Sequence, residues 1–187
     1  MNKVNKELKK LDKDPLDFAT LNVREGTNMV DATILGPEGT PYDGGAFHLE
    51  ITIPSNYPLV PPSIKFVTHI YHPLVDKDNG KFCNEAISEQ WKAVNNLTTV
   101  MNIVYDMLKN YSNCEMAVDP DIGNEVHNNL PQFIATAKKW TEQYACSFVS
   151  FNKHLICLCL FIFLSYPLFF DLLPRHPLLS PRPTITK

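Results

Sequence analysis

The chain has 187 residues, enough for one domain of ordinary size and an extension. Apolar residues make up 44% of it, so a hydrophobic core can form. The formal net charge of −3 excludes the broad basic surface that general binding to a nucleic-acid backbone requires. Residues 1–145 carry 13 Lys and Arg against 19 Asp and Glu, whereas residues 146–187 carry 4 against 1. We therefore expect an acidic domain followed by a tail of different character.

The first element, residues 2–13, is predicted to be an amphipathic surface helix. Val4, Leu8 and Leu11 recur at helical spacing. The helix should end at Asp14, because the proline that follows disfavours helical geometry in the residue before it. Its other faces carry five lysines, Lys3, Lys6, Lys9, Lys10 and Lys13. These lysines form either a solvated face or a docking surface for a partner with acidic groups.

Four short apolar runs then predict β-strands at residues 18–23, 29–35, 46–53 and 64–67. In the third run, Phe47, Leu49 and Ile51 alternate with polar residues, as expected of a half-buried strand. Strands that follow one another without intervening helices predict an antiparallel meander.

Residues 69–96 show no sustained period and are expected to form a long irregular segment, which in a compact domain is usually functional. Helical spacing returns at residues 98–108 and again at 122–144. Pro131 either divides the last helical region or starts its second helix. The element order predicts an α+β domain.

The cysteines lack the paired spacing of a zinc site, and we expect no bound metal. There are five, Cys83, Cys114, Cys146, Cys157 and Cys159. Residues 2–6 are polar and carry no apolar signal core. We therefore expect reducing surroundings in the cytosol or nucleus, where a free thiol can remain a nucleophile.

Several motifs in order resemble the ubiquitin-conjugating enzyme family. A proline-rich stretch, 36–62, precedes the Ile-Tyr-His-Pro segment 70–73, and Lys-Lys-Trp-Thr-Glu-Gln-Tyr-Ala closes the region at 138–145. Cys83 comes eleven residues after the histidine of that segment, and Trp91 comes eight residues after Cys83. The resemblance implies the α+β ubiquitin-conjugating fold: an N-terminal helix, a four-stranded antiparallel meander, an active-site loop and C-terminal helices.

The resemblance covers residues 1–145 and implies that they form a catalytic domain. Cys83 would accept ubiquitin, or a similar modifier, from the activating enzyme as a thioester and pass it to a ligase cysteine or a substrate lysine. ATP is used by the activating enzyme, so this chain would need no cofactor. A small buried hydrophobic residue is the alternative for Cys83. The turn at 79–81 and the polar pair 84–85 favour the reactive role.

Leu74 stands where the family has the asparagine of His-Pro-Asn, to which an oxyanion-stabilising role is assigned. Leucine has no side-chain donor, and losing one such donor typically costs roughly 10²–10³ in rate. Three interpretations remain open. Transfer to lysine is impaired while thioester formation survives, another donor such as Asn79 or Asn84 takes over, or the protein is a catalytically silent module that binds ubiquitin or a partner.

The resemblance implies further roles around the thiol. His72 would support the loop through hydrogen bonds rather than act as a base. Glu85 and Glu115 would orient or deprotonate an acceptor lysine, with solvated surface carboxylates as the alternative. Ligase recognition would use four residues, Lys6, Leu59, Trp91 and Lys92. Core packing is the alternative for Trp91.

The tail, 146–187, is apolar and then proline-rich. Residues 155–164 are ten apolar residues in a row, and the run reaches sixteen at residue 170 with one serine and one proline included. A membrane-spanning helix needs about 20. The tail is therefore a membrane anchor, an apolar extension packed on the domain or on a partner, or a segment without selected structure.

Overall fold

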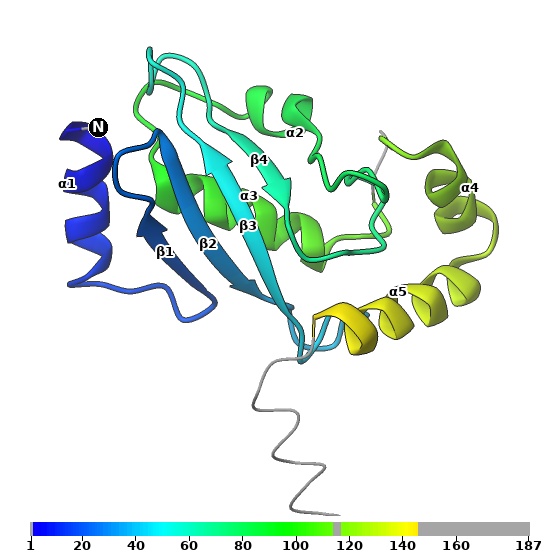
Figure 1. The fold of residues 1–187 in the computed structure, drawn as a ribbon. Helices are drawn as coiled ribbons and strands as arrows, with labels where there is room; N and C mark the ends of the chain where they lie inside the picture. The colour runs from blue at the N-terminus through cyan, green and yellow to red at the C-terminus, as the bar shows by residue number, and fades with distance from the viewer. Residues whose placement is uncertain (1, 114–116, 146–187) are drawn as a thin grey trace, which may run out of the picture. The chain divides into compact units, whose positions relative to one another are not determined.

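The computed structural model describes residues 2–113 and 117–145. They form the nine elements labelled in Figure 1: α1 (Asn2–Leu11), β1 (Ala19–Val23), β2 (Met29–Leu35), β3 (Ala46–Thr52), β4 (Ser63–Phe66), α2 (Asn84–Ser88), α3 (Leu97–Lys109), α4 (Pro120–Asn128) and α5 (Leu130–Tyr144). The predicted order of a helix, four strands, a loop and further helices is confirmed.

The four strands form one antiparallel sheet in the order β1-β2-β3-β4, which confirms the predicted meander. In β3, Phe47, Leu49 and Ile51 are at most 1% exposed, whereas His48 between them is exposed. Because side chains alternate along a strand, this register buries one face of the sheet and leaves the other face to solvent.

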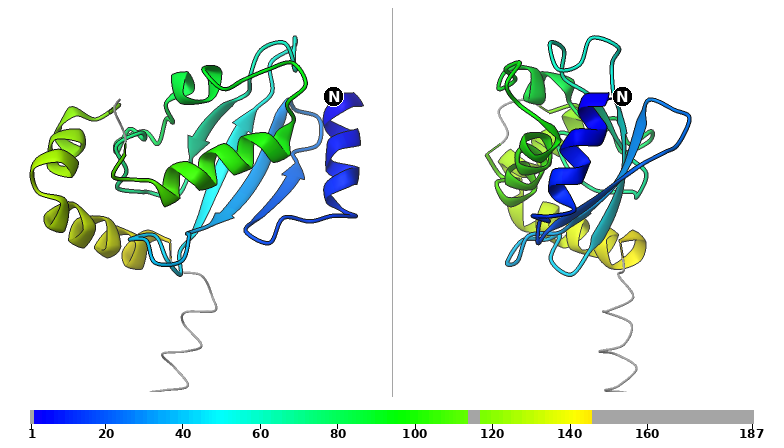
Figure 2. Two further views of the ribbon diagram at one scale, coloured as in Figure 1. Left: turned by 180° about the vertical axis from the view of Figure 1, so that it is seen from behind. Right: turned by 90° about the vertical axis from the view of Figure 1, so that its left-hand side faces the viewer.

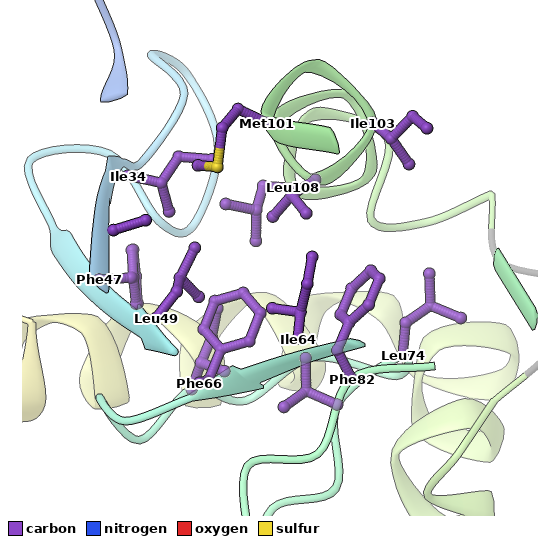
Figure 3. Packing of buried hydrophobic residues seen from close by; sticks show 14 of the residues in the cluster. Ile34, Phe47, Leu49, Ile64, Phe66, Leu74, Phe82, Met101, Ile103 and Leu108 are labelled. Carbon is purple, nitrogen blue, oxygen red and sulfur yellow. The ribbon is translucent and has the colours of Figure 1, made fainter. Parts of the chain in front are cut away.

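The core lies between the buried face of the sheet and α3, which crosses that face (Figure 2, left). An asparagine–threonine capping box, Asn96 with Thr99, begins α3 by satisfying backbone donors of its first turn. Its apolar stripe includes Met101 and Leu108, which face sheet residues in Figure 3. This packing supplies the rigid support on which the irregular segment after β4 rests.

The largely buried carboxylate of Glu7 connects α1 to two other parts of the domain. Glu7 Oε2 accepts hydrogen bonds from Tyr57 Oη at 2.8 Å and from the backbone N–H of Leu97 at 3.0 Å. Burial, together with the bond to Glu7, raises the pKa of Tyr57, so the phenol remains a donor. Glu7 thereby positions α1 against the proline-rich loop after β3 and against the start of α3.

One prediction for the segment 69–96 was wrong, because Asn84–Ser88 form the short helix α2. Five residues are too few to show helical periodicity, and the turn is formed because Ala86 and Ile87 pack into the core. Pro131 lies in the first turn of α5, so it starts the second helix of the predicted pair.

The predicted tail lies outside the described residues, as do Cys114 and Glu115. Across residues 2–113 and 117–145, no helix is long and apolar enough to span a membrane.

Replacing Glu7 with alanine tests the importance of this connection. We expect Glu7→Ala to lower the free energy of unfolding by about 1–3 kcal/mol, because the Tyr57 hydroxyl and the Leu97 N–H lose their acceptor. Urea denaturation followed by circular dichroism measures the change. Glu89→Ala, at an exposed carboxylate, is the control and should change stability little. Equal stability of the two variants would contradict the assignment.

Candidate active site around Cys83

The segment that carries Cys83 folds back on itself and is closed by a tight turn. The Cys83 N–H donates to Leu74 O at 2.9 Å, and Val75 pairs with Phe82. At the turn, Gly80 has a φ of +75°, and a Cβ there would lie 2.0 Å from Phe66 O. Only glycine fits this position. The loop therefore holds Cys83 at a defined place beside β4.

His72 is fully buried beneath this loop. Its Nδ1 accepts from the backbone N–H of Leu74 at 3.0 Å, and its Nε2 donates to Met107 O in α3 at 3.3 Å. Burial lowers the pKa of His72 to about 4, partly opposed by the bond to Met107. The imidazole is therefore neutral at physiological pH, and both of its nitrogens form hydrogen bonds. These bonds connect the loop to α3.

Cys83 is only 7% exposed and belongs to the hydrophobic cluster, although its polar neighbours had suggested a more accessible thiol. It is buried because α2 follows directly and packs Ala86 and Ile87 inward. Burial raises the pKa of Cys83. The backbone N–H of Ala86 opposes this effect, and the carboxylate of Glu85 adds to it.

Glu85 lies in the first turn of α2 with an exposed side chain. Its Oε2 is 3.5 Å from Cys83 Sγ, which donates to it. The pKa of Glu85 is lowered by its own backbone N–H, by the thiol hydrogen bond and by the nearby Lys81 ammonium. An ionised carboxylate therefore lies directly beside the thiol at neutral pH.

Leu74 is 6% exposed and is packed into the core, at the Phe82 end of the cluster in Figure 3. Of the two other donors considered, Asn79 is committed to the turn: its Nδ2 donates to Asp76 Oδ2 at 2.8 Å and its Oδ1 accepts from the Lys81 N–H at 2.8 Å. Asn84 Oδ1 is buried without a hydrogen-bond partner. Asn79 therefore cannot supply the missing donor without breaking the turn.

A second acidic group near the loop had no predicted role. Asp119 caps α4 and accepts from Lys77 Nζ at 2.5 Å, while the adjacent Val118 N–H donates to Pro73 O at 2.8 Å. Burial acts to raise the pKa of Asp119, but the bonds from Lys77 and the Ile122 N–H outweigh it, and the pKa is lowered. The Asp-Pro sequence at 119–120 could have predicted the start of a helix. The ion pair of Asp119 with Lys77 could not have been predicted, because the two residues are 42 positions apart and form no local pattern.

The predicted partner-binding residues lie on two neighbouring loops and on α1. Trp91 Nε1 donates to Pro58 O at 2.8 Å, which brings the loop after β3 to the loop before α3. Leu59 is 74% exposed and Val94 is 84% exposed on these loops. Lys92 is exposed beside Trp91, and Lys6 is exposed on α1. Trp91 itself is half-buried against the core.

Within the described ranges, no group of three or more His, Cys, Asp or Glu side chains could hold a metal ion.

The sequence matches the family model of ubiquitin-conjugating enzymes over residues 3–141. The chain belongs to this family. It is 33% identical over 144 residues to ubiquitin-conjugating enzyme E2 13 of Schizosaccharomyces pombe, covering 76% of this chain and 96% of the relative. It is 36% identical over 151 residues to ubiquitin-conjugating enzyme E2 T of Xenopus laevis, covering 78% and 77%.

Solved structures support the assignment of the chain to the ubiquitin-conjugating enzyme family. A Toxoplasma gondii ubiquitin-conjugating enzyme domain superimposes with a TM-score of 0.69 at 32% identity, covering 77% of this chain and 97% of that one. The fold of this ubiquitin-conjugating enzyme family member is therefore that of its relatives.

The carboxylate beside the thiol should control thiol ionisation. We expect Glu85→Gln to lower the pKa of Cys83 and to speed its alkylation severalfold at pH 7–8, because the negative charge is removed and the amide N–H can donate to the thiolate. The measurement is the iodoacetamide rate at the Cys83 peptide, read by mass spectrometry across pH. Glu89→Gln, at the exposed carboxylate that ends α2, is the matched control. Slower alkylation of Glu85→Gln would contradict the electrostatic role.

Proposed function

We propose that Cys83 accepts ubiquitin from the activating enzyme as a thioester and passes it to a ligase cysteine or a substrate lysine. The observation that carries the proposal is the placement of Cys83 in a loop tied to α3, in a chain that belongs to the ubiquitin-conjugating enzyme family. In the first step Cys83 loses its proton to solvent, and its thiolate attacks the thioester carbonyl of the charged activating enzyme. A new carbon–sulfur bond forms, the carbon–sulfur bond to the activating enzyme breaks, and that enzyme's thiolate leaves. The acyl exchange uses no metal or organic cofactor.

The second step requires a neutral amine or a second thiolate at the same carbonyl. Glu85 is exposed beside the sulfur and carries a negative charge, so it is suited to attract an ammonium group and to receive its proton. The loops with Leu59, Trp91 and Lys92, together with Lys6 on α1, form the proposed surface for the ligase. We propose a location in the cytosol or nucleus. Anchoring in a membrane through the tail is the less favoured alternative, beside an apolar extension packed on the domain or on a partner and a segment without selected structure.

Leu74 favours thiol exchange over transfer to lysine. Its side chain is packed into the core and has no donor for the oxyanion of an attacking amine. A thiolate is a better nucleophile at thioesters and needs less assistance. The buried thiol and the apolar Leu74 also support a second candidate function, a silent module that binds ubiquitin or a partner without transferring it.

A charging reaction with activating enzyme, ATP and ubiquitin tests the thioester. We expect one adduct that disappears under reducing conditions and is absent in Cys83→Ala, because only the thiol can form it. Cys114→Ala is the control and should still be charged. A folded protein that forms no adduct beside a working control enzyme would favour the silent module.

Replacing Leu74 with asparagine tests whether the missing oxyanion donor limits transfer to an amine. In a chase of the charged enzyme with free lysine, we expect Leu74→Asn to speed aminolysis toward the roughly 10²–10³-fold that one oxyanion donor provides. The buried amide should also lower the free energy of unfolding by about 1–3 kcal/mol. Leu74→Ala opens space without adding a donor, and its aminolysis rate should not rise. If the asparagine variant is no faster than Leu74→Ala, the missing donor is not limiting.

A further inference from the structure

Two lysines lie directly opposite each other beside the active-site loop. Lys65 of β4 pairs with Lys81 as an isolated antiparallel bridge, and both side chains are exposed. The flanking backbone bonds belong to neighbouring residues, so this is a non-hydrogen-bonded pair, the kind whose side chains come closest. Like charges in such a pair repel each other. Among the described residues, neither lysine forms an ion pair with a carboxylate.

Glu50 of β3 lies opposite Lys65 but is bound elsewhere. The two residues are in register across the sheet. Glu50 Oε1 accepts a hydrogen bond from Arg24 Nη2 at 2.8 Å, and Arg24 also pairs with Asp31. Glu50 therefore belongs to a separate cluster of charges on the solvent-facing side of the sheet. The lysine pair remains available to an anion from outside the domain.

Both lysines line a cleft of about 380 Å³ between β4 and the start of α2. A volume of this size accommodates a side chain or a short stretch of peptide. Its walls also include Ser63, Asn79 and Asn84, so most of its lining residues are polar. Asn84 Oδ1 is buried without a hydrogen-bond partner, which is costly for a carbonyl oxygen. Because Asn84 directly follows Cys83, a ligand in the cleft lies next to the thiol.

The charges around the thiol have a definite spacing along the chain. Lys81 comes two residues before Cys83, and Glu85 comes two residues after it, with its carboxylate 3.5 Å from the sulfur. Cys83 has extended dihedrals of −61° and 106°, and residues two apart in an extended chain are separated by about 7 Å. A negative charge at the sulfur and positive charges about 7 Å away complement a peptide in which an ammonium and a carboxylate are two residues apart.

We propose that this cleft selects the acceptor: Lys65 and Lys81 bind a carboxylate two residues from the acceptor lysine, while Glu85 attracts the lysine itself to the thioester on Cys83. This rests on the proposed function. The substrate class is an extended acidic segment with an exposed lysine. In the transfer, the lysine gives a proton to Glu85 or to water, its nitrogen bonds to the carbonyl carbon, and the carbon–sulfur bond breaks. The Cys83 thiolate then takes up a proton.

Selection of this kind is most useful in a chain with leucine at position 74. Without the oxyanion donor, a lysine that meets the thioester by chance is transferred slowly. An acceptor held beside the thioester by a second contact has a higher effective concentration there. Acidic segments are therefore favoured over other lysine-containing segments, although the chemical step is the same for both.

The test uses the full 187-residue chain, charged with ubiquitin by activating enzyme and ATP and then chased with three peptides of equal length. The first has glutamate two residues on each side of its single lysine, and the second has glutamine there. The third has the net charge of the first, with both glutamates at the far ends. Conjugates formed per charged enzyme are measured by mass spectrometry. We expect the first peptide to react about threefold to tenfold faster than the other two, and the difference to shrink at high salt.

Lys65→Gln and Lys81→Gln should each reduce this preference, and the double variant should abolish it, because the carboxylate loses its partners. Lys139→Gln, at an exposed lysine of α5, is the matched control and should keep the preference. Equal rates for the three peptides, or a preference that survives in the double variant, would overturn the acceptor site and leave the thioester function intact.

If no thioester forms, the proposed function is overturned, and a titration decides the site. The first and second peptides are added to the uncharged, isotope-labelled chain, and backbone amide shifts are followed by NMR. Shifts at Lys65, Lys81 and Asn84 that only the glutamate peptide produces would support the site. No difference between the two peptides at these residues would overturn it.

Discussion

The two hydrogen bonds of His72 join the active-site loop to the rest of the domain. One nitrogen accepts from Leu74 and the other donates to Met107 in α3, and Leu74 in turn accepts from Cys83. A protonated imidazole could not accept the first bond, so the arrangement requires the neutral ring that burial favours. The position of the thiol therefore depends on a histidine that has no free nitrogen for proton transfer.

The charged side chains around the active-site loop have two different roles: some hold the loop in place, and one lies beside the thiol. Lys77 and Asp119 satisfy each other and connect the loop to α4, so neither is free to act on an incoming group. Glu85 faces solvent beside the sulfur. Burial and the adjacent carboxylate both raise the pKa of Cys83, so the thiolate is less favoured here than in a cysteine exposed to solvent.

Most of the fold followed from patterns of a few residues. The alternation in β3 predicted its buried face, and the run of strands without helices predicted the antiparallel meander. Cys83, Leu74 and His72 were identified because they lie in short motifs. The helix α2 was missed because five residues are too short for a period, and the pairing of Lys77 with Asp119 was missed because the partners are distant in sequence.

The sequence by itself determined the family, the order of the elements other than α2, the cysteine at the loop and the absence of a donor at Leu74, since each is a property of residue type and spacing. Only the tertiary structure decided how buried the thiol is, that Asn79 is committed to its turn and that Lys77 pairs with Asp119. Burial and charge pairing arise from segments brought together by folding, and no local pattern records which distant groups will meet.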